Sequence, residues 1–177
     1  MTDPLSTVRI TFVGGGNMAA ALIGGMIARG AAPGRIAAID PSDAQRASLA
    51  ARFGIATHPA PSGPALDAEV VVLAVKPQQM REAVAAIGPH LRAPLVLSVA
   101  AGVRAEDLSR WLGGHVRIVR TMPNTPALVG LGATGLAAFP GTGDADRRLA
   151  ESILGAVGIA VWVDDESKLD AVTALSG

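Results

Sequence analysis

Cysteine is absent from the 177-residue sequence, which excludes disulfides, thiolate catalysis and thiolate-bound zinc. This absence fits a reducing compartment, so we expect a cytoplasmic protein. The three histidines, His58, His90 and His115, lie too far apart in the sequence to form a local metal motif. No metal site is therefore expected.

A net charge is also lacking, because 15 lysines and arginines offset 15 aspartates and glutamates. Such a chain has no overall attraction for nucleic acid or anionic lipid. The longest nearly apolar run, Met18 to Ala28, is shorter than the roughly 20 residues that a membrane span needs. We therefore expect a soluble protein that binds neither nucleic acid nor a membrane.

Hydrophobic residues make up 50% of the chain, enough to build one buried core in a chain of single-domain length. The runs that we predict as strands are Val8–Val13, Ile36–Ile39, Val70–Val75, Leu95–Val99, Val116–Val119, Ala133–Phe139 and Ala160–Val163. The segments that we predict as helices are Asn17–Arg29, Ser42–Gly54, Gln78–Leu91, Arg104–Leu112, Asp144–Val157 and Glu166–Leu175. Alternating strands and helices, with apolar runs in the strands that are continuous rather than alternating, predict a doubly wound α/β fold with a mostly parallel sheet and helices on both faces.

The first predicted strand runs directly into three glycines and then into a helix. Gly14, Gly16 and Ala19 satisfy the pattern G-x-G-x-x-A at this junction. Gly14 permits the tight turn, Gly16 lets a pyrophosphate approach the backbone, and Ala19 lets the helix lie close to the strand. Phosphates bind the exposed amides at the start of such a helix. The pattern predicts a Rossmann-type, dinucleotide-binding sheet rather than a purely structural turn.

Asp40 ends the second predicted strand, where an acidic residue commonly binds the adenosine ribose of NAD. Its carboxylate would repel a 2′-phosphate, which favours NAD. However, Ser42 and Arg46 follow closely and could reach a phosphate, and Asp40 could equally serve as a turn or helix-cap residue. The choice between NADH and NADPH stays open.

Three further breaks follow predicted strands and consist of small residues, glycine or proline. They are Ala74-Val75-Lys76-Pro77, Ala100-Ala101-Gly102 and Met122-Pro123-Asn124-Thr125-Pro126. Ligands of open α/β sheets bind at the carboxyl ends of the strands, and small residues leave room there for a flat cofactor ring. Each break alone is as readily a structural turn, but three at one edge favour a site.

Other catalytic machinery is not evident. The sequence shows no Ser-His-Asp set, paired carboxylate site or phosphate-binding lysine motif, so no catalytic residue is assigned. Asp164-Asp165-Glu166 forms an acidic cluster, which we interpret as the charged start of a helix rather than as a site.

Four segments together resemble the N-terminal domain of the pyrroline-5-carboxylate reductase family. They are Phe12-Val-Gly-Gly-Gly-Asn-Met-Ala19, Ala74-Val-Lys-Pro77, Ser98-Val-Ala-Ala-Gly102 and Met122-Pro-Asn-Thr-Pro-Ala127. The resemblance covers Val8 to Gly177, and the pairing of Gly-Asn-Met with Met-Pro-Asn-Thr-Pro is its most specific part. It implies reduction of 1-pyrroline-5-carboxylate to L-proline by NADPH or NADH, the last step of proline biosynthesis.

The resemblance also implies roles for individual residues. The pyrophosphate-contacting turn would comprise Gly14, Gly16, Asn17, Met18 and Ala19. Asp40 and Ser42 are candidates for cofactor contact from their position after the second strand, and many members of the family carry neutral or basic residues near Asp40 instead. The nicotinamide half would lie beside Ala74, Val75, Lys76, Pro77, Ala100, Ala101 and Gly102. Asn124 would orient cofactor or substrate, and Ser176 would bind the substrate carboxylate. A protonated C=N bond is already electrophilic, so hydride delivery needs mainly alignment, in agreement with the lack of a catalytic dyad.

The sequence departs from the family's pattern at its end, where members continue into a helical domain that pairs subunits and completes the substrate pocket. We expect residues 1–165 to form the dinucleotide-binding domain and 166–177 to begin a linker helix toward a missing C-terminal domain. The full-length form would then be a homo-oligomer. This chain would bind dinucleotide but have little or no activity.

Two alternatives remain open at this point. One is another NAD(P)-dependent reductase on the same fold, acting on an imine or a β-hydroxyacid. The other is a non-catalytic domain that senses NAD(H), although such a sensor would not need the segment Met122 to Pro126.

Overall fold

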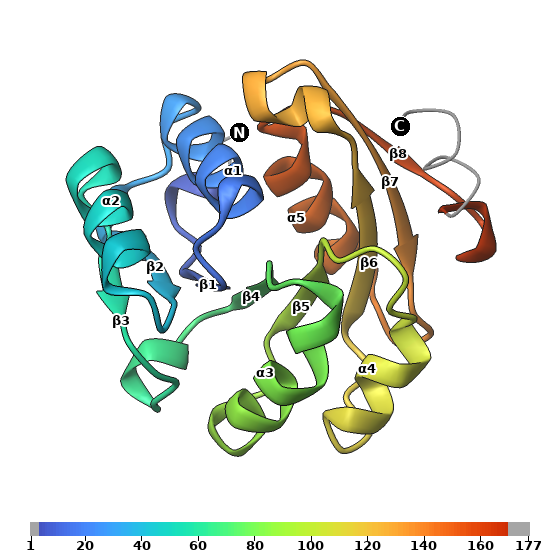
Figure 1. Ribbon diagram of the computed structural model, residues 1–177. Coiled ribbons are helices and arrows are strands. Elements are labelled where there is room, and N and C mark those ends of the chain that lie inside the picture. The colour runs from blue at the N-terminus through green and yellow to red at the C-terminus, as the bar shows by residue number, and fades with distance from the viewer. Residues whose placement is uncertain (1–3, 170–177) are drawn as a thin grey trace.

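An eight-stranded sheet with the order β3-β2-β1-β4-β5-β6-β7-β8 runs through the computed structural model, which describes residues 4–169 (Figure 1). The strands are β1 (Ile10–Val13), β2 (Ile36–Ile39), β3 (Ala56–His58), β4 (Val70–Leu73), β5 (Leu95–Ser98), β6 (Ile118–Pro123), β7 (Gly132–Ala138) and β8 (Gly158–Trp162). Neighbouring strands from β3 to β6 are parallel. Every residue of β1, β4 and β5 is buried, as strands covered on both faces require.

Helices cover both faces of this sheet, and Figure 1 shows α1 and α5 above it and α3 and α4 below it. The helices are α1 (Asn17–Ala28), α2 (Asp43–Phe53), α3 (Met80–Ile87), α4 (Ala105–Trp111) and α5 (Asp144–Gly155). The helices α1, α2 and α5 share one hydrophobic cluster with the sheet, while α3 and α4 share the other. The predicted doubly wound, mostly parallel α/β fold is therefore confirmed.

The last two strands run in the opposite direction to the other six. Strand β7 is antiparallel to β6, and β8 is parallel to β7. Residues 124–131 connect β6 to β7, and this connection is shorter than the dozen or so residues that a parallel crossover needs. The connection from β7 to β8 contains α5 and is long enough for a parallel pair.

Several predicted boundaries were wrong for identifiable reasons. The helix predicted for Gln78–Leu91 is a 3-10 turn (η4, Pro77–Gln79), then α3, then another 3-10 turn (η5, Gly88–His90), because Pro89 cannot continue an α-helix. Strand β6 extends to Pro123, beyond the predicted end at Val119. Strand β3 was not predicted, since its three half-buried or exposed residues form no apolar run.

The end of the described chain contributes to the core. Residues 167–169 are helical, and the side chain of Leu169 is buried. None of the helices in residues 4–169 has the length and apolar character required to cross a bilayer. Ser176 and most of the predicted linker segment lie outside the described residues.

Candidate functional site

The parallel strands end at one edge of the sheet, and the sequence-predicted segments follow them there. Asp40 follows β2, Gly14 follows β1, Ala74 follows β4, Val99 follows β5 and Asn124 follows β6. The four strands β2, β1, β4 and β5 are paired in parallel with their last residues in register. Segments more than one hundred residues apart in the sequence therefore share the carboxyl edge, where α/β sheets bind ligands.

The glycine turn is fitted tightly onto the neighbouring strand ends. The Gly14 amide donates to the Ile39 carbonyl at 2.8 Å. A Cβ atom at Gly14 would lie 2.6 Å from the Ala74 carbonyl oxygen, and its φ of +98° disfavours other residues. Only glycine fits at this position without displacing the backbone of the β4 turn.

The turn opens at Gly16, which is the N-cap of α1. Gly16 has an extended backbone and no side-chain cap bond, and a Cβ there would meet no heavy atom within 4 Å. The first amides of a helix have no intrahelical acceptor, so they can donate to an anion that approaches this open backbone. Ala19 is fully buried against the sheet, Met18 is half-buried, and Asn17 is exposed. The turn therefore presents an open backbone and the start of α1 at the carboxyl edge of the sheet.

Asp40 supports the glycine turn as well as ending β2. Its Oδ2 accepts a hydrogen bond from the Gly15 amide at 2.7 Å, and its Oδ1 accepts one from the Ser42 amide at 2.8 Å. Each carboxylate oxygen has a further lone pair for a ribose hydroxyl. The alternative role as a turn residue is therefore real, and it does not exclude the contact with ribose.

The residues after Asp40 are largely engaged within their own loop. The Ser42 hydroxyl caps α2 by accepting from the Gln45 amide at 3.4 Å. Arg46 donates to the Asp40 carbonyl at 2.7 Å and forms an ion pair with Asp43. This arrangement leaves the guanidinium of Arg46 neutralised by a nearby carboxylate, which weakens its attraction for a 2′-phosphate.

The segments that follow β4 and β5 place small or exposed residues at this edge. Ala74 and Val75 are half-buried, and Lys76 and Pro77 are exposed. In the next break, Ala100 is buried, whereas Ala101 and Gly102 are exposed. The turns thus leave backbone and small side chains at the surface, as a flat ring would require.

Asn124 directly follows β6, at the same carboxyl edge of the sheet. Its Oδ1 accepts from the Ala133 amide at 2.9 Å, which fixes the carboxamide oxygen and leaves the amide nitrogen as a donor. The 3-10 segment that follows, η6 (Thr125–Val129), packs on α1, with Ala127 buried in the core. The loop of Asn124 and the helix of the glycine turn therefore touch.

A buried ion pair that the sequence pattern did not predict lies behind this edge. Arg120 Nη1 lies 3.1 Å from Glu166 Oε1, and the Arg120 side chain is only 2% exposed. Glu166 was interpreted as part of a charged helix start, and that interpretation did not foresee its partner. An arginine inside the apolar run of β6 was the available signal, because a buried arginine requires an acceptor.

A second ion pair, at the opposite edge, has a clear electrostatic effect. Arg117 holds Asp146 through two hydrogen bonds, of 3.1 Å from Nε and 2.7 Å from Nη2. These bonds lower the pKa of Asp146 below its ordinary value, although burial opposes the shift. The same bonds raise the pKa of Arg117.

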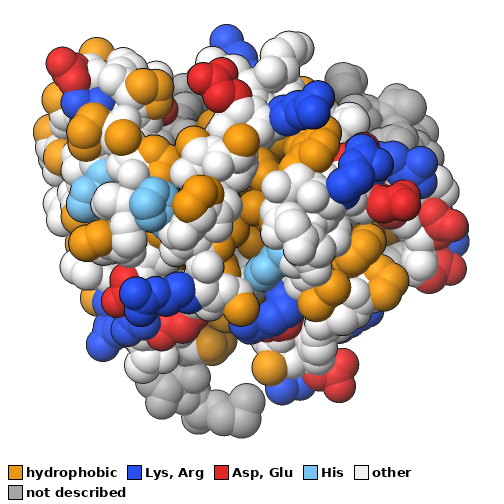
Figure 2. All heavy atoms as spheres, turned by 90° about the horizontal axis from the view of Figure 1, so that it is seen from below, with side chains coloured by type: hydrophobic (Ala, Val, Ile, Leu, Met, Phe, Trp, Pro, Cys, Tyr) orange, Lys and Arg blue, Asp and Glu red, His pale blue; other side chains and the backbone are white. Residues whose placement is uncertain are grey.

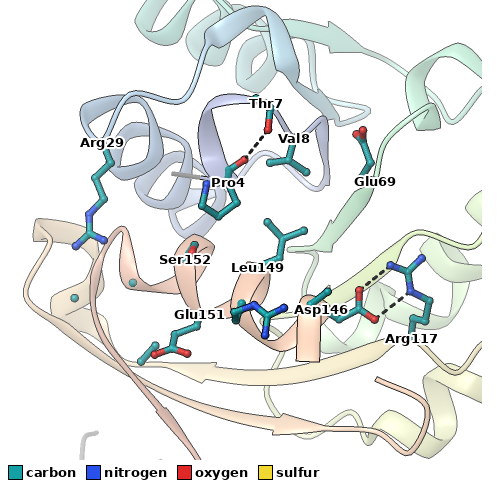
Figure 3. Close-up of a pocket in the computed structure, with 15 residues that line it drawn as sticks. Pro4, Thr7, Val8, Arg29, Glu69, Arg117, Asp146, Leu149, Glu151 and Ser152 are labelled. Atoms are coloured by element: carbon teal, nitrogen blue, oxygen red, sulfur yellow. Dashed lines mark hydrogen bonds and ion pairs between the residues drawn. The ribbon is translucent and has the colours of Figure 1, made fainter. Parts of the chain in front are cut away.

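This ion pair borders an open cavity of about 1050 Å³ that lies along α5 and the N-terminal segment (Figure 3). Arg29, Arg148, Glu69 and Glu151 also line it, so its charges are mixed. A smaller hollow of about 220 Å³ lies between α1 and η6. Neither cavity is lined by the glycine turn or by the Ala100–Gly102 break.

On the surface that carries α3 and α4, the described residues mix both signs of charge. Figure 2 shows blue and red side chains scattered over this face, with hydrophobic ones between them. Among residues 4–169, no three histidine, aspartate or glutamate side chains gather in a way that could hold a metal ion. The chemistry of the carboxyl edge is thus that of backbone amides, small residues and a few polar side chains.

Comparisons with known proteins agree with this chemistry. A family model described as NADP oxidoreductase coenzyme F420-dependent matches residues 9–102. A pyrroline-5-carboxylate reductase of Pseudomonas aeruginosa is 48% identical over 174 residues, which are 98% of this chain and 64% of the relative. One of Haemophilus influenzae is 45% identical over 169 residues, covering 95% of this chain and 62% of the relative.

Solved structures give the same picture. A pyrroline-5-carboxylate reductase of Coxiella burnetii superposes with a TM-score of 0.93 at 42% identity, over 97% of this chain and 64% of that one. A pyrroline carboxylate reductase of Plasmodium falciparum with NADP bound superposes with a TM-score of 0.84 at 25% identity, over 97% and 63%. The chain thus spans a little under two thirds of the length of these relatives.

Proposed function

This chain belongs to the family described as NADP oxidoreductase coenzyme F420-dependent, and from that membership we propose that it binds NADPH or NADH along the carboxyl edge of its sheet. We propose further that it is the dinucleotide-binding part of a pyrroline-5-carboxylate reductase. The enzyme would reduce 1-pyrroline-5-carboxylate to L-proline, the final step of proline biosynthesis. The identities of 48% and 45% to two reductases of that name support the assignment.

One observation carries the proposal, namely the contrast between two glycines of the same turn. The space beside the Gly14 backbone is filled, and the space beside the Gly16 backbone is empty. Gly14 is fixed against Ala74, whereas nothing fills the space at Gly16, where α1 begins. The pyrophosphate would lie there, held by the amides of Asn17, Met18 and Ala19. A purely structural turn would not need an unfilled second glycine.

The rest of the dinucleotide would extend along the edge in both directions. Asp40 and Ser42 would contact the adenosine ribose, since they follow β2 next to the turn. Ala74, Val75, Lys76 and Pro77 would line the nicotinamide half together with Ala100, Ala101 and Gly102. Because Asp40 is negative while Ser42 offers a hydroxyl, the chain accepts either cofactor in this proposal, with no preference assigned.

The proposed reaction requires little acid–base catalysis from these residues. The reduced nicotinamide supplies a hydride, and a protonated C=N bond accepts it without a strong acid from the protein. The chain's contribution is to hold the ring and the imine in line at this edge. Asn124 would donate from its fixed amide nitrogen to the cofactor or the substrate carboxylate, and Ser176 would bind that carboxylate as well.

We propose that residues 1–165 are the dinucleotide-binding domain and that 166–177 lead toward the remainder of the enzyme. The relatives are longer by about a third of their length, since this chain covers 64% and 62% of two of them. The remaining part would complete the substrate pocket and pair subunits into a homo-oligomer. A cytoplasmic location would suit a biosynthetic step that uses reduced dinucleotide.

The test is a titration of the purified chain with NADPH and NADH, followed by addition of L-proline. Trp111 on α4 and Trp162 on β8 are the only tryptophans, so energy transfer to reduced nicotinamide reports binding. We expect saturable binding, tightened by L-proline, and little turnover of 1-pyrroline-5-carboxylate. Binding unaffected by L-proline would instead support a dinucleotide sensor, and absence of any binding would overturn the proposal. Robust turnover by these 177 residues would contradict the need for a further domain.

A further inference from the structure

The segment after β8 reaches back to the turn that joins β5 to α4. Glu166 Oε1 accepts a hydrogen bond from the Ala105 amide at 2.8 Å, and the same oxygen lies 3.1 Å from Arg120 Nη1. The Glu166 side chain is 22% exposed and that of Arg120 is 2% exposed. A single carboxylate oxygen therefore joins three segments that are distant in the sequence.

The first of these contacts fixes the downstream end of the β5–α4 turn. Ala105 is the first residue of α4, and its amide has no acceptor inside the helix. The N-cap residue, Arg104, makes no side-chain cap bond, so Glu166 supplies the acceptor that the helix start lacks. At its upstream end the turn is held by the Val99 amide, which donates to the Leu73 carbonyl at 3.1 Å. The exposed residues Ala101 and Gly102 lie between these two attachments.

The second contact ties the same carboxylate to the strand that leads to Asn124. Arg120 lies in β6 opposite Ser98 of β5. Because its guanidinium is buried, a charged acceptor such as the Glu166 carboxylate is favoured beside it over a neutral one. Arg120 therefore holds Glu166 in place, and Glu166 holds α4 relative to β6. This oxygen therefore adds a side-chain link between the start of α4 and β6, beside the ladder that already pairs β5 with β6.

We propose that Glu166 is a positioning residue for the nicotinamide half of the site, acting through Ala105 and Arg120 without touching the ligand. This inference rests on the proposed function, because it presumes that the Ala100–Gly102 turn contacts the nicotinamide half. The adenine half would lie at the glycine turn and Asp40, whose carboxylate accepts from the Gly15 and Ser42 amides. The two halves of the dinucleotide should consequently respond differently to changes at Glu166.

The experiment measures binding of NADPH and of 2′-phospho-ADP-ribose, which lacks the nicotinamide, to the full chain. Glu166→Ala removes both contacts, and we expect NADPH to bind roughly tenfold more weakly, a change of one decade in Kd, with the fragment unaffected. Glu166→Gln keeps an acceptor for the Ala105 amide but loses the charge that faces Arg120. Its NADPH affinity should lie between those of the wild type and Glu166→Ala. Normal binding of the fragment by both variants is the result that a general loss of stability would not produce.

Asp164→Asn is the matched control, since Asp164 belongs to the same segment but pairs with the exposed Lys168. It should bind both ligands as the wild type does. Equal weakening of both ligands in Glu166→Ala, or unchanged binding of both, would overturn the positioning role. If the wild type binds neither ligand, the proposed function fails and this inference fails with it.

Discussion

The glycine turn and the β5–α4 turn lie on the same edge of the sheet, but they are held in different ways. The first is fixed by backbone packing, since the Ala74 carbonyl occupies the space where Gly14 would carry a Cβ. The second is fixed by a side chain from the far end of the described chain, where Glu166 binds the Ala105 amide. Where the backbone itself is packed, as at Gly14, almost no substitution is tolerated. A side-chain contact, such as that of Glu166, can be weakened gradually by a series of substitutions.

The largest effect is expected where packing is tightest, at Gly14. Gly14→Ala forces a Cβ into the Ala74 carbonyl at an unfavourable φ, and should lower the free energy of unfolding by about 2–4 kcal/mol. Gly16→Ala is the matched control, because its Cβ meets open space. It should leave urea unfolding unchanged while weakening NADPH binding. Equal stability of the two variants would show that packing does not separate the two glycines.

A smaller effect on stability is expected at Asp40, whose side chain holds the backbone of the glycine turn. Asp40→Ala removes the acceptor of the Gly15 and Ser42 amides, and should cost about 2 kcal/mol in the free energy of unfolding. Asp40→Asn retains one carbonyl oxygen and should cost less. Binding titrations of both variants with NADH and NADPH then separate support of the turn from contact with ribose. A variant that is fully stable yet selectively loses NADH affinity would assign Asp40 to the ribose alone.

The ion pair at the opposite edge tests whether stability and binding can be separated. Asp146→Asn should lower the free energy of unfolding by about 1.5 kcal/mol at neutral pH and leave NADPH binding unchanged. The hydrogen bonds of Arg117 depress the pKa of the folded-state carboxyl, so its stabilisation is complete above the unfolded pKa of about 3.9. The stabilisation is lost as the pH falls through the folded-state pKa.

Unfolding curves of the wild type and Asp146→Asn should therefore differ at pH 7 and converge in acid. Arg117 remains charged over this whole range, since its own pKa is raised. A stability difference that persists unchanged in strong acid would mean that the carboxylate does not act through its charge.

The smallest effect is expected at Asn124, where a single side-chain bond holds the loop. Asn124→Ala removes the acceptor of the Ala133 amide and should cost about 1 kcal/mol. Asn124→Asp keeps an acceptor but has no amide donor, so its stability should be nearly normal. If the donor serves the ligand, Asn124→Asp should weaken L-proline binding to the NADPH complex in calorimetric titration. A normal affinity for L-proline in this variant would show that the Asn124 amide does not contact the ligand.

Much of the fold was predictable because its signals are local. The runs at residues 36–39 and 70–73 are apolar throughout, and those at 10–13 and 95–98 each contain one hydroxyl residue. Glycine follows α1, α2 and α3 within two residues of their ends. A helix was predicted to begin at Ser42, and the Ser42 hydroxyl does cap α2 by accepting from the Gln45 amide. Strand β3 was missed because an edge strand of three residues buries too little to leave a pattern.

The site was predictable in part. The glycine pattern and the breaks after β4, β5 and β6 all meet at one edge, as parallel pairing requires. The partners of the polar side chains were not foreseen, including the amides that Asp40 accepts from and the acceptor role of Asn124 toward Ala133. Hydrogen-bond partners depend on distances across the sheet, and spacing along one chain does not contain those distances.

The sequence by itself determined the order of buried strands and covering helices, and with it the edge at which Gly14 and Asn124 gather. That information is local, because burial on both faces and backbone freedom are properties of short segments. Only the tertiary structure decided that Arg120, enclosed in β6, has Glu166 as a partner and that Glu166 also caps α4. A buried charge requires an opposite charge nearby, but folding alone selects which of the 15 acidic residues supplies it.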